Sequence, residues 1–388
     1  MSIRYKHFIL IIMLVFTFSA CNSTESELGS IGTPTPTLAP TTMIRTSTQT
    51  AVPTFTPPPL ISISAIVWDS QPLVPIVNFH QFMDDGITPS SKNGHKMQLE
   101  DLYYSLENLY DQGFSLVSLG RWISGDLDVP EGRRPIILTM DDLFFRNQVL
   151  LGKDGEPDPE TGIGVIWQFS KEHQDFGFHL SLFSILGDKY YPSDPAYDPD
   201  WEKEFAEVVV WLIEHDAMIY NHTYRHGYLG LVNNPVSMDT FMEQLNQNDV
   251  RLRELLAIAD REDLVTKVDN ILALPGGIPP QSQNDMDTLL SYRNPEGLPL
   301  QAIMHIYSAA TDPIDLTYMA NPFNQDFNPF SIPRITGTLY YINYLVENSD
   351  QFPIARYCEL TLDENRILED SYLASQIEEA VQNKKCPS

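Results

Sequence analysis

The chain has 388 residues, 43% of them hydrophobic and 11% aromatic, which suffices for one large domain or two ordinary ones. These proportions exclude a wholly disordered chain. The formal net charge is −28, from 24 Lys and Arg residues against 52 Asp and Glu residues. Such an acidic balance argues against nucleic-acid binding and against broad adhesion to anionic lipid.

The first 21 residues have the pattern of a secretory signal. Arg4 and Lys6 form a short basic region, residues 8–18 are an unbroken apolar run, and two small residues precede Cys21. The run is short for a membrane span. The segment resembles a bacterial lipoprotein signal, in which the cysteine is lipidated and becomes the mature N-terminus, although Phe18 replaces the usual Leu. The alternative is an ordinary secretory signal with an incidental cysteine.

Residues 22–61 are dominated by Ser, Thr and Pro and show no apolar period. Such a segment cannot bury a core, so we expect a disordered tether between the lipid anchor and a single folded domain at 62–388. Cys358 and Cys386 lie near the C-terminus, and an extracytoplasmic location permits a disulfide between them. The cysteines lack metal-ligand spacing, which argues against a zinc–thiolate site.

Short apolar runs and helical spacings alternate along residues 62–388. The spacing of apolar residues predicts helices. Gly113 is in a C-terminal cap position after the predicted helix 99–110, and Ser237 or Asp239 is the N-cap of the predicted helix 238–256. This alternation predicts a parallel sheet or a (β/α) barrel, in which chemistry gathers at the carboxyl ends of the strands. The predicted strands are 75–79, 135–140, 179–185, 217–220, 271–274 and 302–309, and the predicted helices are 99–110, 201–213 and 238–256.

Two pairs of polar residues directly follow predicted strands. Asp141 and Asp142 follow the second strand, and a bend at the strand end would deliver both carboxylates to one site. His222 and His226 follow the fourth strand, at a spacing that lets two imidazoles reach one ion. One Asp with two His suits Zn²⁺ or another divalent ion and leaves positions open for water and substrate. The alternatives are a solvated turn or helix cap for the Asp pair and a hydrogen-bonded loop for the His pair.

Four segments, taken in order, carry a family resemblance. They are PIVNFH at 75–80, TMDD at 139–142, HTYRH at 222–226 and LALPGG at 272–277, and IPRI at 332–335 resembles a late motif of some branches. The set is similar to the polysaccharide deacetylase family, the NodB homology domain of carbohydrate esterase family 4. The likeness spans roughly residues 73–337 and implies a distorted (β/α) barrel that forms a single catalytic domain.

The resemblance also implies roles for individual residues. Asp142, His222 and His226 would bind a divalent metal, zinc above all, and Asp141 would be the general base for a water molecule. The chemistry agrees, because a metal lowers the pKa of water and polarises an amide carbonyl while a carboxylate takes the proton. Gly276, in the Pro-Gly-Gly turn, would supply a backbone N–H to the oxyanion, since glycine permits close approach.

The sequence departs from the family pattern at several positions. Leu143 replaces the small residue that usually follows the Asp pair. The Arg that many members carry before the Pro motif, where it orients the base, is absent, and Arg334 is the candidate to replace it. No segment clearly matches the late Leu-His motif that provides the general acid. His305 is the candidate acid, against the alternative of a core histidine, and His80 and Arg334 are candidates to line the substrate site.

These observations support competing functional hypotheses. The first is a lipid-anchored, monomeric, metal-dependent enzyme at the cell surface or in the periplasm that N-deacetylates a cell-envelope or extracellular polysaccharide. An O-acetyl esterase on an acetylated polysaccharide would use the same residues. The second is a non-catalytic glycan-binding lipoprotein on the same fold, which the missing Arg, the missing acid and Leu143 favour. The third is an envelope interaction protein on an unrelated barrel.

Overall fold

The computed structural model describes most of the chain after residue 59. The predicted signal with Cys21 and nearly all of the predicted tether lie outside the described residues, as does Cys386. In the part of the chain that is described, no helix is both long and apolar enough to cross a bilayer. The described residues are 60–68, 73–83, 96–144, 147–187, 200–230, 234–306, 320–322, 324, 326–366, 372, 375, 376 and 379.

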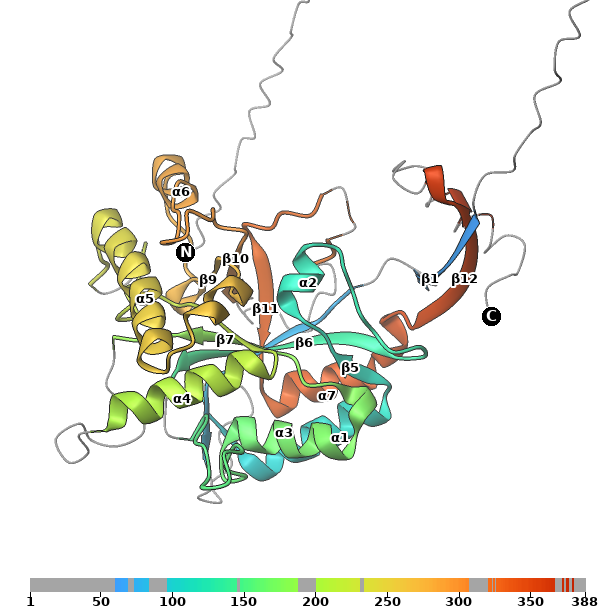
Figure 1. Cartoon of the computed structure of the whole chain (residues 1–388), viewed down its shortest axis with the longest axis horizontal. Helices are drawn as coiled ribbons and strands as arrows, with labels where there is room; N and C mark the ends of the chain where they lie inside the picture. The colour runs from blue at the N-terminus through green and yellow to red at the C-terminus, as the bar shows by residue number, and fades with distance from the viewer. Residues whose placement is uncertain are drawn as a thin grey trace, which may run out of the picture. The chain divides into compact units, whose positions relative to one another are not determined.

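Parallel strands close into a barrel (Figure 1). Each strand pairs in parallel with the next, and β11 pairs with β2 while β2 also pairs with β6, which completes the ring. The expected distorted (β/α) barrel is therefore confirmed. Within the described residues the ring has seven strands: β2 (Ile76–Phe79), β6 (Arg134–Leu143), β7 (Leu180–Ser184), β8 (Ala217–Asn221), β9 (Ile271–Ala273), β10 (Ala302–Ile306) and β11 (Ile332–Thr336).

Helices surround the barrel and supply most of its outer core. The apolar stripe of α1 buries Leu102, Leu106 and Leu109 against the same cluster as α3, α4 and α7. Fully burying one such side chain contributes about 1.5–3 kcal/mol. The helices are α1 (Leu99–Asp111), α2 (Leu119–Ile123), α3 (Gly162–Glu172), α4 (Trp201–Glu214), α5 (Met238–Ile258), α6 (Gln283–Leu290) and α7 (Leu339–Glu347).

The three helices expected from apolar spacing are present as α1, α4 and α5. The N-cap of α5 is Ser237, whose side chain accepts a hydrogen bond from the backbone N–H of Thr240. Gly113, with φ of 79°, directly follows the C-cap of α1, and its N–H donates to the carbonyl of Tyr110. These end signals fix where the helices begin and stop.

The short helix α2 closes the amino end of the barrel. Its Leu119 and Trp122 are buried in a cluster with side chains from the first halves of the strands, including Ile76, Ile137 and Ile271. The strand β5 (Phe114–Leu116), which leads into α2, pairs in parallel with the first three residues of β6. Because α2 occupies the amino end, the polar residues after the strands lie at the opposite, carboxyl end.

Smaller elements complete the described part of the chain. β1 (Leu60–Trp68) pairs antiparallel with β12 (Ala355–Asp363), and β3 (Gln81–Met83) pairs in parallel with β4 (Lys96–Gln98). Cys358, on β12, is buried and disulfide-bonded. The 3₁₀ turns are η1 (Gln174–Phe176), η2 (Glu262–Lys267), η3 (Pro275–Gly277), η5 (Ser349–Gln351) and η6 (Glu364–Arg366).

Candidate metal and catalytic site

The end of β6 bends so that two neighbouring carboxylates face one site. Asp142 has φ of 57°, and the pairing of β6 with β7 shifts register between Met140 and Leu143. Without such a bend, adjacent side chains on a strand point to opposite faces. With it, Asp141 Oδ2 lies 3.8 Å from Nε2 of His222, and Asp142 Oδ1 lies 3.6 Å from the same nitrogen.

The segment after β8 is a tight turn held by its own polar groups. Thr223 and His226 have φ of 66° and 53°, a region that non-glycine residues seldom occupy. The Asn221 side chain accepts from the N–H of Thr223 at 2.8 Å, and the Thr223 hydroxyl accepts from the N–H of Gly227 at 3.0 Å. Backbone strain of this kind persists only where surrounding bonds enforce it, and it concentrates at functional sites. The turn brings the rings of His222 and His226 to a centroid distance of 4.8 Å.

Asp142, His222 and His226 form a donor set that fits a divalent ion. One ligand atom from each lies within 4.8 Å of the others, and Asp142 Oδ1 is 3.3 Å from Nε2 of His226. The carbonyl of Ala273 lies 2.8 Å from Nδ1 of His222 and can only accept, so Nδ1 carries the proton and Nε2 presents its lone pair. Burial lowers the pKa of His222 to about 3, so the ring is neutral, as metal binding requires. Three nitrogen and oxygen donors match an open zinc site.

Asp141 is buried and held as an anion. Arg334 donates to both of its oxygens, at 2.6 Å to Oδ1 and 2.9 Å to Oδ2, and the Asn78 amide donates to Oδ2 at 3.1 Å. Burial alone would raise the pKa of this carboxyl, but the charge and the hydrogen bonds of Arg334 hold the pKa well below its usual range. Asp141 is therefore ionised at every physiological pH.

Arg334 is locked beneath the site rather than exposed to substrate. It comes from β11, its side chain is 0% exposed, and its Nη1 also donates to Asn78 Oδ1 and Thr139 Oγ1 at 3.1 and 3.2 Å. The guanidinium carbon stands 5.0 Å from the ring centroid of Phe183. This arrangement matches the expectation that Arg334 orients Asp141. Its burial gives no support to a role in lining the substrate site.

Asn78 and Thr139 were not identified from the sequence. Asn78 lies within the apolar run of β2, and Thr139 lies within that of β6, and both side chains are fully buried. A buried polar residue in an apolar run needs an internal partner, because burial without one is costly. A polar residue within an apolar run is the one sequence signal that could have identified Asn78 and Thr139, and it does not indicate which residues they contact.

The Pro-Gly-Gly turn lies beside the His pair. Gly276 is exposed with φ of 63°, and a Cβ on it would stand 2.9 Å from Cε1 of Tyr228. The ring of Tyr228 in turn meets that of His226 edge-on, at 4.7 Å between centroids. The N–H of Gly277 is used within the turn, donating to the carbonyl of Leu274 at 2.8 Å. Gly276 therefore lies next to Tyr228, which contacts the metal-ligand candidate His226, and its role as the oxyanion donor stays a prediction.

The two remaining candidate histidines, His80 and His305, differ in whether they lie near Asp141. His80 is buried, and the Gln148 amide that donates to the His80 carbonyl also donates to the Asp141 carbonyl at 2.9 Å. His305 is half-buried on β10, where strand alternation puts it on the face of Ile303, outside the barrel wall. Burial lowers the pKa of His305, which disfavours the protonated form that an acid needs. The structure therefore brings His80 to the site and does not group His305 with it.

No family model and no curated protein matches the sequence. Among solved structures, the chain is similar to the deacetylase PplD of Streptococcus pyogenes in complex with acetate (15% identity, TM-score 0.44, 73% of this chain and 99% of that one). It is also similar to IcaB from Ammonifex degensii (13% identity, TM-score 0.45, 72% of this chain and 97% of that one). A third similar structure is a de-N-acetylase from Aggregatibacter actinomycetemcomitans (12% identity, TM-score 0.42, 70% of this chain and 99% of that one).

Proposed function

We propose that this chain is a metal-dependent hydrolase that removes acetyl groups by N-deacetylation from a cell-envelope or extracellular polysaccharide. Such an enzyme acts on carbon–nitrogen bonds other than peptide bonds. The observation that carries the proposal is the convergence of Asp142, His222 and His226 beside a second, ionised carboxylate, Asp141. A metal donor set next to a separately held base is the arrangement that hydrolysis of an unactivated amide needs.

The described residues divide the chemistry between them. A divalent ion held by Asp142, His222 and His226 would act as a Lewis acid on the acetyl carbonyl and on a water molecule. Asp141 would accept the proton of the attacking water, since Arg334 and Asn78 keep its carboxylate ionised and fixed in orientation. The strong pairing weakens Asp141 as a base, so orientation rather than basicity is its main contribution.

Protonation of the leaving amine is the step for which the site offers no established donor. Of the two candidate histidines that are not proposed metal ligands, His80 is linked to Asp141 through the amide of Gln148, whereas His305 is on the outer face of β10. This gap is the specific observation that favours the second hypothesis, a glycan-binding protein that holds a metal without turnover. An O-acetyl esterase needs less help at this step, because an alkoxide leaves more readily than an amide nitrogen.

Metal content and acetate release test the proposal together. The full-length chain, Asp142→Ala and a surface control, Asp154→Ala, are incubated with Zn²⁺, dialysed and assayed for bound metal. We expect about one ion per chain in the parent and the control and none in Asp142→Ala. The same three proteins are then given N-acetylated and O-acetylated glycans, and released acetate is measured.

Each outcome decides between the hypotheses. Acetate from the N-acetylated glycan that disappears in Asp142→Ala supports the deacetylase. Acetate from the O-acetylated glycan alone identifies an esterase. One bound ion without acetate from either glycan favours the binding protein, and no stoichiometric metal in the parent would overturn the hydrolase proposal.

We further propose that the protein works outside the cytoplasm as a monomer held to a membrane through lipid on Cys21. The support is the signal-like N-terminus and the Ser-, Thr- and Pro-rich residues that follow it. The disulfide bond at Cys358 agrees with an oxidising compartment. Mass spectrometry of the N-terminal peptide from the native host tests this location directly.

A further inference from the structure

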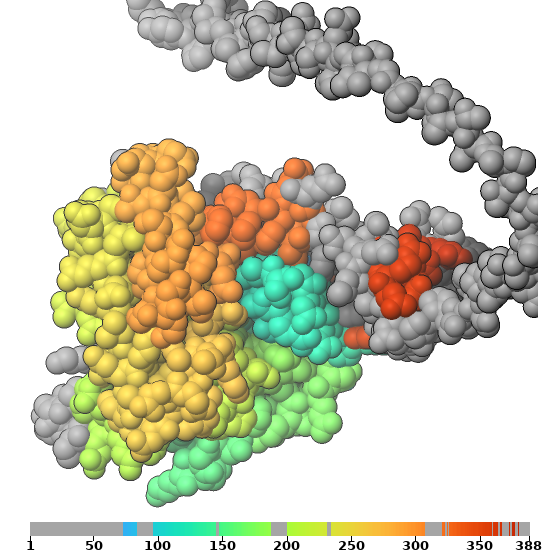
Figure 2. Space-filling view, turned by 45° about the horizontal axis from the view of Figure 1, so that its top comes forward, coloured from blue at the N-terminus to red at the C-terminus, as the bar shows by residue number. Residues whose placement is uncertain are grey.

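A cavity lies at the end of the barrel opposite to Asp142. It has a volume of about 590 Å³, within the range of small-molecule sites. Its walls come from α2 and from the segments that precede β9, β10 and β11, represented by Arg121, Asp269, Gln301 and Phe327. In Figure 2 the teal surface of α2 adjoins the orange surface of the chain near β10 and β11. The metal donors, in contrast, lie within the last residues of β6 and after the carboxyl end of β8.

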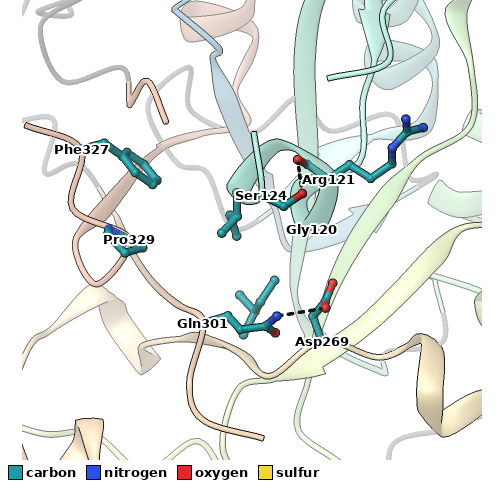
Figure 3. Close-up of a pocket in the computed structure, with 9 residues that line it drawn as sticks. Gly120, Arg121, Ser124, Asp269, Gln301, Phe327 and Pro329 are labelled. Carbon is teal, nitrogen blue, oxygen red and sulfur yellow. Dashed lines mark hydrogen bonds between the residues drawn. The ribbon is translucent and has the colours of Figure 1, made fainter. Parts of the chain in front are cut away.

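The two sides of this cavity differ in chemistry. Phe327 and Pro329 lie on one side, and Asp269 and Gln301 lie together away from them (Figure 3). The Gln301 amide donates to Asp269 at 3.3 Å, while its oxygen accepts from the N–H of Asn270 at 2.8 Å, so the two planar groups are fixed side by side. An apolar ring on one side and a carboxylate–amide pair on the other suit a pyranose, whose C–H face is apolar and whose edge carries hydroxyls.

The phenyl ring and the carboxylate are both held in place. Phe327 packs edge-on against the fully buried Trp122, at 5.5 Å between ring centroids. Gly120 lies against Asp269, and a Cβ at this glycine would stand only 2.3 Å from the Asp269 carboxylate. The absence of a side chain therefore lets α2 approach the carboxylate closely. A site with its binding groups fixed in advance loses little entropy when a ligand enters.

The charge of the cavity favours a cation. The Arg121 guanidinium forms ion pairs with Asp126 and Asp128, at 2.9 Å each. Figure 3 shows the Arg121 side chain extending away from Gln301 and Phe327. Asp126 and Asp128 thus balance the charge of Arg121, and among the residues that line the cavity Asp269 is the carboxylate. A protonated amine would meet both the local negative charge and the charge of −28 on the whole chain.

We propose that this cavity binds one amino-sugar unit, a protonated 2-amino-2-deoxyhexose, of the deacetylated polysaccharide. The inference rests on the proposed function, because N-deacetylation turns a neutral acetamido group into an ammonium group. The ammonium donates to Asp269, Gln301 binds a neighbouring hydroxyl, and the sugar ring lies against Phe327. The enzyme would then hold the product polymer at one end of the barrel while the other end acts on units that are still acetylated.

Titration calorimetry with two sugar probes tests this proposal. The fully deacetylated glucosamine trimer and the N-acetylated trimer are titrated into the full-length chain, loaded with Zn²⁺, and into its variants. We expect the parent to bind the cationic trimer more tightly than the neutral one, and Asp269→Asn to lose about tenfold or more in affinity for it. Phe327→Leu keeps an apolar wall without the aromatic face and should also weaken binding. Asp263→Asn, an exposed carboxylate near the start of β9, is the matched control.

The variants separate this site from the metal site. Binding of the cationic trimer that survives in Asp142→Asn and weakens in Asp269→Asn supports the cavity. Unchanged affinity in Asp269→Asn, equal affinity for the two trimers, or loss in Asp142→Asn alone would each overturn it. Acetate release by the parent is measured separately, so a chain that binds through Asp269 without releasing acetate defeats the proposed function and not the sugar site.

Discussion

Replacing Arg334 by Met probes the buried charge pair on which the proposed base depends. Met keeps much of the length and apolar volume of the side chain but removes the guanidinium. Asp141 then loses both of its Arg334 hydrogen bonds, at 2.6 and 2.9 Å, and keeps the one from Asn78. Thr139 and Asn78 lose their bonds to Nη1 as well. The substitution therefore leaves a buried carboxylate without its counter-charge.

The expected cost follows from the burial of both partners, which are at most 1% exposed. Removing one partner of a buried ion pair costs about 3–5 kcal/mol, a large share of the roughly 5–15 kcal/mol that stabilises a domain. The pKa of Asp141, now governed by burial, should rise above its ordinary value. A raised pKa means that the variant gains stability relative to the parent as the pH falls through that pKa.

Urea unfolding and the pH profile of acetate release measure these effects. The midpoint of unfolding should fall in Arg334→Met, and the deficit should shrink at acidic pH, where the carboxyl can be buried in neutral form. The acidic limb of kcat/KM should move to higher pH, because the base must be ionised to act. Adding Asp141→Asn should restore much of the stability without restoring activity, since an amide needs no counter-charge.

Arg261→Met is the matched control, because Arg261 pairs with Glu214 and Asp263 at the surface. Exposed pairs contribute little, so this variant should unfold and turn over like the parent. The reasoning fails if Arg334→Met is as stable as Arg261→Met, or if its acidic limb coincides with that of the parent. An Arg334→Met/Asp141→Asn double variant that is no more stable than Arg334→Met would also contradict it.

Further predictions concern His305, Tyr228 and the two C-terminal cysteines. His305→Gln should keep kcat within about threefold of the parent, whereas loss of a true proton donor costs about 10²–10⁴-fold in acetate release. Tyr228→Phe should retain the zinc affinity of the parent, because the ring contact with His226 remains, and Tyr228→Ala should weaken it in a competition titration with a chelator. Cys358→Ser and Cys386→Ser should each lower the free energy of unfolding by about 2–4 kcal/mol and leave one reactive thiol, if these two cysteines pair; unequal effects would show another pairing.

Local patterns were enough to predict much of the barrel. The apolar runs at 135–140 and 217–220 became β6 and β8, and the helical spacing at 99–110 became α1. Elements too short to show a period were not predicted, and α2, with five residues, is the clearest case. β11 carries Pro333, which argues against a central strand, yet it pairs with β10 on one side and β2 on the other.

The site was predictable only where its residues are close in sequence. Asp141 with Asp142, and His222 with His226, could be read from spacing and from their place after strands. Arg334 was a candidate to orient Asp141 only through the family resemblance, and Asn78 was not identified, because these residues lie on β11 and β2 and reach β6 only when the barrel closes. The separation of 256 residues between Asn78 and Arg334 leaves no local pattern to read. Closure of the barrel therefore determines the electrostatics of the base.

Apolar side chains inside the barrel lie between the metal site at its carboxyl end and the cavity at its amino end. Asp141, Arg334 and Thr139 form a polar layer toward the carboxyl end, and Phe183 lies directly under the Arg334 guanidinium. Below Phe183 the interior is an apolar cluster that continues to Trp122 of α2. A change of charge at Asp269 can affect the metal site only through this packed layer. Closely packed side chains carry little energetic coupling between two sites unless they can switch between two discrete conformations. The pH profile of acetate release should therefore be the same in Asp269→Asn and in the parent, even where affinity for the deacetylated trimer differs.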